Sequence, residues 1–246
     1  MSLKQKLFYA LMQSRIYPHI YFHANPFKIY EFRELTRNNR PRPTDQVLDI
    51  GCGAGLQTRI LARTAGRTVG IDISKNALDR ARSEAPASGD ERVEFRLTTI
   101  ESAGFQADQF DKIYSVCVIE HIPDFRSVFR ECLRILKPGG VLCFSVDSLK
   151  SIEDESFLQD HAREHKVVRY FSCRELKQEL EDVGFKDVSV KPILCSAAAR
   201  GLFMKHISER SQFRYSRSIL WSFLLRWADV FARKDEGIFL IARCRK

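Results

Sequence analysis

The sequence predicts a doubly wound α/β domain that carries two basic, mostly helical appendages. Between residues 46 and 146, short apolar segments alternate with amphipathic segments, which is the pattern of a parallel sheet with helical crossovers. The first apolar segment runs into a glycine-rich turn, as a strand does where an α/β sheet binds a ligand. The chain has 246 residues and is 44% hydrophobic, which is enough to bury one large core.

The core elements are expected in a regular order. Strands are expected at 46–50, 68–73, 93–97, 111–116 and 141–146. Helices are expected at 57–64, from the N-cap Ser74 to about 85, and from about 124 to 136. The Lys137-Pro138-Gly139-Gly140 segment is expected to form a turn.

Later elements complete the core and define its appendages. Ser172 to Glu175 forms a capping box, whose helix ends at Val183 before Gly184. Final strands are expected at 187–190 and 237–242. Residues 1–40 are helical and aromatic in pattern. We therefore predict an N-terminal cap (1–42), a core (43–192), a helical insertion (193–236) and the final core strand (237–246).

Cysteine usage and hydropathy exclude several protein classes. The chain has seven Cys, an odd number, with no C-x-x-C pair, which argues against a disulfide framework and a zinc finger. The N-terminus lacks a signal-peptide core, and the apolar stretch 219–231 contains Arg226 and Asp229. We expect a cytoplasmic protein with reduced thiols and no transmembrane segment.

The net charge of +9 is concentrated in the two appendages. Residues 1–42 contain eight basic and two acidic residues, and residues 193–234 contain the same numbers. The remaining core is therefore slightly acidic. This distribution favours anionic partners near the appendages.

The strongest motif is Val47-Leu48-Asp49-Ile50-Gly51-Cys52-Gly53-Ala54-Gly55, a strand that enters a glycine-rich turn. Glycines allow backbone N–H groups to approach a ligand that a Cβ would exclude. Asp72 ends the second strand about 20 residues after Gly51, where a carboxylate can accept both ribose hydroxyls of an adenosine. The alternative for Asp72 is an acid near a helix start.

Four segments in this order resemble the class I S-adenosylmethionine-dependent methyltransferases: VLDIGCGAG, VGIDIS, FDKIYSVCVIEHIPD and LRILKPGGVLCFSV. The EHIPD segment is similar to the branch with the ubiquinone-biosynthesis-type enzymes, methyltransferase type 11. The resemblance covers about residues 44–192 and the last strand. It implies a Rossmann-like seven-stranded sheet of order 3-2-1-4-5-7-6, with strand 7 antiparallel and helices on both faces. It also implies S-adenosylmethionine as the cofactor.

The resemblance also implies which residues contact this cofactor. Those expected around its methionine part are Asp49, Gly51, Cys52, Gly53 and Gly55. Asp72 would bind the ribose, Ile73 would pack on the adenine, and Val116 and Val118 would line the pocket near the methyl group. An Asp that often follows the third strand in this family is absent, so Thr99 and the Ile100 backbone would contact the adenine instead.

The candidate catalytic residue is His121, which follows the fourth strand. It could act as a general base or, with Glu120, as a divalent-metal ligand, or it could form a structural hydrogen bond. His161 and His165 are four residues apart, but Ala162 occupies the position where a zinc-protease motif needs Glu. We therefore predict no metal and place both on a solvated face or in a lid contact. Tyr170 and Phe171 are expected to pack.

The appendages are expected to border the acceptor site. Ligands of an open α/β sheet bind outside the carboxyl ends of its parallel strands, and the 193–234 insertion leaves the sheet at that end. Within it, Leu220, Phe223, Leu224, Trp227 and Phe231 fall on one helical stripe. Our first interpretation is a stripe buried against the core. A lid over an apolar acceptor, a surface that docks on anionic lipid, and an RNA contact are the alternatives.

Three functions follow from these patterns. The first is methyl transfer, to oxygen of a small or amphipathic anionic acceptor such as a lipid intermediate or a glycan precursor. The second is RNA methylation, which ranks lower because no RNA-binding module is recognisable. The third is a non-catalytic cofactor-binding partner subunit, which the missing adenine acid and the absence of a clear base motivate.

Overall fold

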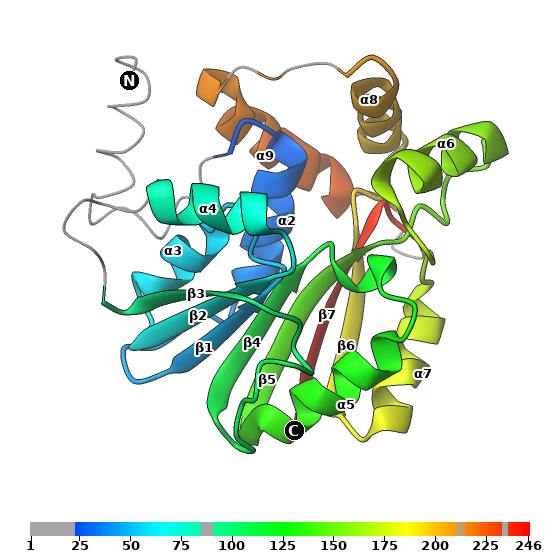
Figure 1. The fold of residues 1–246 in the computed structure, drawn as a ribbon. Coiled ribbons are helices and arrows are strands. Elements are labelled where there is room, and N and C mark those ends of the chain that lie inside the picture. The colour runs from blue at the N-terminus through cyan, green and yellow to red at the C-terminus, as the bar shows by residue number, and fades with distance from the viewer. Residues whose placement is uncertain (1–22, 85–90, 211–212, 214, 233–235) are drawn as a thin grey trace.

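The computed structural model describes residues 23–84, 91–210, 213, 215–232 and 236–246, and their core is one mixed sheet (Figure 1). Its strands are β1 (Gln46–Ile50), β2 (Arg67–Asp72), β3 (Val93–Leu97), β4 (Phe110–Val116), β5 (Leu136–Asp147), β6 (Lys186–Ile193) and β7 (Phe239–Arg245). They lie in the order β3-β2-β1-β4-β5-β7-β6. β1 to β5 are parallel, and β7 is antiparallel to both β5 and β6. The predicted fold class is confirmed.

Helices cover both faces of the sheet (Figure 1). They are α2 (Pro26–Thr36), α3 (Leu56–Ala62), α4 (Lys75–Ser83), η1 (Ile119–His121, a 3₁₀ turn), α5 (Phe125–Ile135), α6 (Glu155–His165), α7 (Cys173–Val183), α8 (Ala197–Ser208) and α9 (Tyr215–Val230). One apolar cluster joins α2 and α3 to the sheet, and a second joins α5 and α7 to its other face. α6, α8 and α9 lie beyond the end of the sheet where β4 and β5 finish.

Local capping explains where the helices of the core begin. Ser74 accepts a hydrogen bond from Ala77 N at the start of α4, and Asp124 accepts one from Ser127 N at the start of α5. The predicted capping box of Ser172 and Glu175 is present, and Gly184 ends α7 in the left-handed conformation. All seven cysteines are free, as expected.

The turn expected at 137–140 is not a separate element. β5 begins at Leu136 and continues through these residues to Asp147. The pairing of β4 with β5 shifts register between Phe110 and Lys112, because Gly139 adopts a φ of +76° and accommodates an irregular stretch inside the strand. The prediction was therefore correct about irregular backbone and wrong about the strand's start.

The apolar stripe of α9 faces outward, so its interpretation as a core stripe was wrong. Its five residues are exposed, with values of 61% for Leu220, 47% for Phe223, 45% for Leu224, 66% for Trp227 and 75% for Phe231. The reason is that α9 packs on α2 through its opposite side, where Asp229 is buried and accepts four hydrogen bonds.

Part of the N-terminal prediction falls outside the described residues, namely everything up to residue 22. In α2, the expected aromatic residues Phe27, Tyr30 and Phe32 are buried in the core. Among the described residues, no helix combines the length and the apolar character that spanning a bilayer requires.

Candidate functional site

The glycine-rich turn after β1 forms an open backbone cradle. The φ angles of Gly51, Gly53 and Gly55 are all positive, at +69°, +53° and +73°, a region that side chains disfavour. A Cβ on Gly51 would come within 2.3 Å of Val118, whereas a Cβ on Gly53 would meet no atom within 4 Å. The backbone at Gly53 is therefore free to be approached by a ligand, and Gly51 brings the loop against the end of β4.

Asp72 lies directly beneath this cradle. Its two carboxylate oxygens each accept a 2.8 Å hydrogen bond, one from Gly53 N and one from Ser74 N. Each oxygen keeps a second lone pair, so the carboxylate can still accept ribose hydroxyls. Beside it, Ile73 is 77% exposed and Leu97 is 51% exposed, which is unusual for large apolar residues at strand ends. Together they offer an apolar shelf for a planar base.

Asp49 supplies a carboxylate at the other end of the cradle. It is fully buried, and only its Oδ2 is paired, with the Thr58 hydroxyl at 2.6 Å. Burial raises the pKa of Asp49 to about 7, against the lowering effect of Thr58. An unpartnered buried oxygen at this position fits the ammonium group of an amino acid. The residues present therefore fit a ligand that joins a nucleoside to an amino acid.

Other predicted cofactor residues are less directly placed. Cys52 is buried, and its side chain packs against Gly70, so only its backbone lies on the loop surface. Thr99 is exposed, and its hydroxyl accepts a hydrogen bond from Ser102 N at 3.3 Å. Ile100 is buried. Val116 is half-buried where β4 ends.

A cluster of charged groups, here called the acid cluster, lies where β4 and β5 end. Its members are Lys28, Glu31, Cys117, Glu120 and Asp147. The Cys117 sulfur lies 3.0 Å from the Lys28 amine, 2.9 Å from Glu31 Oε1 and 3.5 Å from Asp147 Oδ1. Lys28 pairs with Glu31 at 2.8 Å, and Glu120 accepts a hydrogen bond from Asp147 N at 3.1 Å. Cys117 immediately precedes Val118, so the cluster adjoins the cradle.

Burial alters the protonation of the acid cluster. It raises the pKa of Glu120 to about 8, and the charge of Asp147 adds to this effect. Burial also raises the pKa of Asp147, and, with the charge of Glu31, that of the Cys117 thiol well above its ordinary value. The thiol therefore stays protonated at neutral pH, whereas Glu120 gains or loses its proton at a pH close to neutrality. Acids that titrate near neutrality are typical of functional sites.

Two histidines, His121 and His161, lie beside the acid cluster. His161 is only 4% exposed, so of its two predicted placements, a solvated face or a lid contact, the solvated face was wrong. Its Nδ1 lies 2.9 Å from the Tyr170 hydroxyl, and its Nε2 lies 3.8 Å from Asp147 Oδ2. Burial, with the charges of His165 and His121, lowers the pKa of His161 to about 4, so this imidazole is neutral at pH 7. His165 is exposed, and its ring centroid is 4.5 Å from that of His161.

His121, the predicted catalytic residue, is half-buried in η1. Its Nδ1 lies 3.2 Å from the carbonyl oxygen of Lys166, in the segment that joins α6 to α7. This contact suits the structural alternative, since it holds the loop. It also suits a base, because a carbonyl partner at Nδ1 leaves the lone pair on Nε2.

The acid cluster also contains atoms that could bind a metal. Ligand atoms of Cys117, Glu120 and Asp147 lie within 4.8 Å of one another. The Lys28 amine, 3.0 Å from the Cys117 sulfur, already places a positive charge among them. Glu120 Oε2 is buried and accepts no hydrogen bond. Glu31 Oε2 likewise accepts none, but it forms the ion pair with Lys28.

Sequence reasoning missed Lys28, Glu31 and Asp147, whereas Cys117 lies in the segment 116–118 that was expected to line the pocket. A signal existed for Asp147, because it is a carboxylate at the carboxyl end of a predicted parallel strand. Lys28 and Glu31 gave no such signal, since they reach the site only because α2 packs across the sheet. α2, which belongs to the N-terminal segment, therefore borders the acid cluster.

Comparisons with known proteins agree with this geometry. Residues 48–144 match the model of a family described as methyltransferase domain. The chain is 39% identical over 105 residues to the ubiquinone biosynthesis O-methyltransferase of Actinobacillus pleuropneumoniae. The matched region covers 41% of this chain and 44% of that protein. The chain is 36% identical over 122 residues to the enzyme of the same name from Bordetella avium, covering 49% of each. The chain thus spans less than half the length of these relatives.

Solved structures match over more of the chain at lower identity. An S-adenosylmethionine-dependent methyltransferase from Mesorhizobium loti matches 90% of this chain and all of that chain, with a TM-score of 0.64 and 18% identity. A phosphoethanolamine N-methyltransferase 2 from Haemonchus contortus, solved with S-adenosyl-L-methionine, matches 86% of this chain and 51% of that chain, with a TM-score of 0.65 and 20% identity. These similarities show a shared fold.

Proposed function

Because the chain carries a class I S-adenosylmethionine-dependent methyltransferase domain, we propose that it transfers a methyl group to an oxygen atom of a small or amphipathic anionic acceptor. One observation carries the proposal. The acid cluster, with a half-buried histidine beside it, adjoins the cradle through Val118. Transfer to oxygen requires that a proton be removed, and this arrangement places groups able to do so next to the cofactor loop.

The cradle residues would hold the cofactor, which supplies a methyl group already activated on a sulfonium. Asp72 would bind the ribose, the Gly53 backbone would hold the methionine part of the cofactor, and Asp49 would accept a hydrogen bond from its ammonium group. Val116 and Val118 form the wall between the cradle and the acid cluster. These residues would act mainly by aligning the methyl group with the acceptor, and such positioning can lower the activation barrier by about 7–11 kcal/mol.

The proton acceptor in the proposal is His121. Its Nδ1 contact with the Lys166 carbonyl would fix the ring and, in the neutral imidazole, place the lone pair on Nε2. His121 is close enough to Asp147 to affect that carboxylate's protonation. The carboxylate of Asp147 would stabilise the imidazolium that forms when His121 takes the acceptor's proton, and Glu120 would add to this effect above about pH 8, where it is charged.

Lys28 supports an anionic acceptor. Its side chain is 29% exposed at the edge of an otherwise buried cluster, and its amine stays charged because Glu31 lies 2.8 Å away. An ammonium group at this position favours the oxyanion of the acceptor. The basic appendages add to this preference, because α2 itself belongs to the N-terminal one.

Calorimetry and turnover test the proposal. The purified chain should bind S-adenosylmethionine, and Asp72→Ala should weaken that binding by at least about tenfold. Asp79→Ala, which removes an exposed acid of α4, is the matched control and should leave binding unchanged. The wild type should form S-adenosylhomocysteine with phenols or carboxylic acids as acceptors, and not with primary amines. Turnover with amines alone, or no cofactor binding, would contradict the proposal.

His121→Asn tests the proton acceptor. It should lower turnover by about 10²- to 10⁴-fold and leave cofactor affinity unchanged. His165→Asn, on the exposed surface of α6, is the control and should retain turnover. If His121→Asn stays active while Asp147→Asn does not, the proton acceptor is Asp147 instead.

A further inference from the structure

α9 is an amphipathic helix whose polar side faces the protein. The residues that it buries are Ser218, Ser222, Leu225 and Asp229, which recur at helical spacing. Ser218 donates to the carbonyl of Ala24 at 2.6 Å, and Asp229 accepts from the Tyr30 hydroxyl and from backbone N–H groups at the start of α8. These hydrogen bonds fix which side of the helix packs on α2. The orientation of α9 is therefore determined by polar contacts.

The outward side of α9 and the residue that follows it are almost entirely apolar. This side, here called the α9 outer face, consists of Leu220, Trp221, Phe223, Leu224, Trp227, Val230 and Phe231, which are 40–75% exposed. They make up seven of the ten large apolar residues that are exposed in the described part of the chain. Single exposed apolar residues are ordinary, but a contiguous group of this size marks a surface that contacts another apolar phase.

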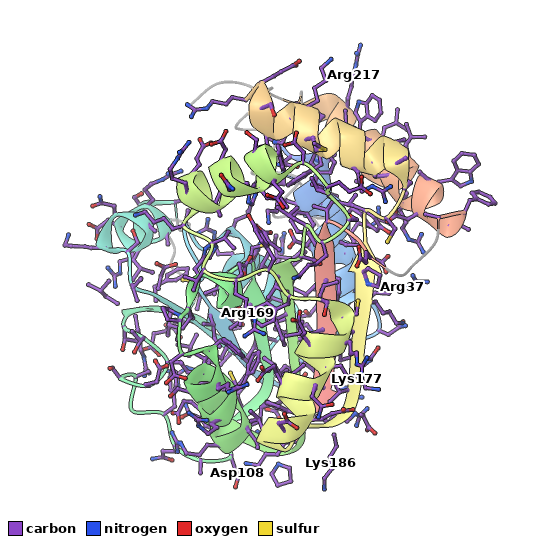
Figure 2. All side chains as sticks on the ribbon, turned by 90° about the vertical axis from the view of Figure 1, so that its right-hand side faces the viewer. Arg37, Asp108, Arg169, Lys177, Lys186 and Arg217 are labelled. Carbon is purple, nitrogen blue, oxygen red and sulfur yellow. The ribbon has the colours of Figure 1, made fainter. Side chains whose placement is uncertain are left out.

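Arginines border the α9 outer face. The Arg33 guanidinium lies 4.1 Å from the centre of the Phe223 ring, and Arg217 is exposed near one end of the helix (Figure 2). Arg226 and Arg37 both pair with Glu34, at 3.0 Å and 3.3 Å. Glu34 thus pairs with two of the four arginines, while the nearby Asp229 is buried and engaged by the backbone before α8 and by Tyr30. The border of the apolar face is cationic.

We propose that the α9 outer face inserts into the headgroup region of an anionic lipid bilayer. A helix that lies in the plane of a membrane exposes aromatic and leucine side chains to the acyl boundary and places arginines at the level of the phosphates. A second copy of this chain fits less well, because pairing two outer faces would bring both sets of arginines together without new anions. A bilayer provides the apolar phase and the negative charge together.

This placement would bring the membrane close to the acid cluster. α9 packs on α2, and α2 carries Lys28 and Glu31. Docking itself does not depend on the proposed reaction, so it can be tested without cofactor or acceptor.

The protein contains its own reporter for the test. Both of its tryptophans, Trp221 and Trp227, belong to the α9 outer face. Vesicles of phosphatidylglycerol and phosphatidylcholine should shift their fluorescence to shorter wavelength and should co-sediment with the chain. Vesicles of phosphatidylcholine alone should bind at least about tenfold more weakly, and added salt should weaken the binding to anionic vesicles.

Two pairs of variants separate the apolar contribution from the charge. Phe231→Ser should weaken vesicle binding by at least about tenfold, while Val168→Ser, an exposed apolar residue between α6 and α7, should not. Arg217→Glu should weaken binding to anionic vesicles, while Lys186→Glu, at the far end of the molecule in Figure 2, should have little effect. Cofactor binding by calorimetry checks that each variant remains folded.

Two results would overturn the proposal. One is the absence of co-sedimentation with anionic vesicles. The other is a concentration-dependent blue shift of the tryptophan emission without lipid, together with a dimer in sedimentation, which would assign the α9 outer face to a second copy.

Discussion

The phenol of Tyr30 donates a 3.0 Å hydrogen bond to the carboxylate of Asp229, which joins α2 to α9. The same carboxylate accepts hydrogen bonds from the backbone N–H groups of Leu194, Cys195 and Ser196, where the chain leaves β6 for α8. One buried side chain therefore connects three segments that are distant in sequence, and it decides which side of α9 faces outward.

Asp229→Ala should lower the free energy of unfolding by about 3–5 kcal/mol, because it leaves several buried donors without an acceptor. Tyr30→Phe removes only one of these donors and should cost about 1 kcal/mol. Urea unfolding of the two variants measures both effects. Equal losses in the two variants would show that the amide contacts contribute nothing.

The glycines of the cradle should separate folding from cofactor binding. Gly55→Ala should cost about 2–4 kcal/mol of stability, because its Cβ would approach the Phe95 ring to 2.5 Å at a φ of +73°. The Cβ that Gly53→Ala adds would meet no atom within 4 Å, so this substitution should lower the free energy of unfolding by only about 1 kcal/mol. It should nevertheless weaken cofactor binding by at least about tenfold, since the new methyl group projects towards the ligand. Thermal unfolding and calorimetry on both variants provide the comparison.

Asp49 should make stability depend on pH. Its pKa rises from 3.8 to about 7 in the folded chain, so between these values the folded state holds a proton that the unfolded state has lost. The contribution of Asp49 to the free energy of unfolding is therefore fully present below about pH 4. It declines as the pH rises towards 7, by up to about 1.4 kcal/mol per pH unit. Asp49→Asn should remove this decline. Denaturant unfolding of both proteins from pH 4 to pH 8 measures the difference, and parallel curves would refute the prediction.

Glu120 should shape the pH dependence of turnover. Its pKa of about 8 means that the carboxylate is protonated below that pH and charged above it. If its charge stabilises the His121 imidazolium, kcat/KM should rise as pH increases through about 8. Glu120→Gln should lower kcat/KM at high pH and abolish this rise. A wild-type profile that is flat between pH 7 and 9 would show that Glu120 does not act in the reaction.

Several parts of the site could be read from the sequence because they depend on neighbours along the chain. The cradle needs glycines at three close positions and a strand before them. Asp72 is positioned by the end of β2 and the N-cap of α4, which are adjacent to it. The same holds for the caps at Ser74, Asp124 and Ser172.

The acid cluster could not be read in this way. Lys28 and Glu31 come from α2, and Cys117, Glu120 and Asp147 come from the ends of β4 and β5, far along the chain. Burial and neighbouring charges shift the pKa values of Lys28, Cys117, Glu120 and Asp147, and no local pattern encodes these effects. His161 was misplaced for a related reason, since helical spacing does not reveal which side of α6 faces Asp147.

The sequence by itself determined the order of strands and helices, the glycine cradle and the position of Asp72 beside it, because local periodicity and turn chemistry specify them. Only the tertiary structure decided which side of α9 is exposed. The spacing of its apolar residues predicts that they form the buried face of the helix. The four hydrogen bonds that the buried Asp229 carboxylate accepts outweigh that preference. If Asp229 faced solvent, the buried donors of Tyr30 and of the backbone before α8 would lose their acceptor, which costs more than exposing apolar side chains. Asp229 therefore faces the protein, and the tryptophans face outward.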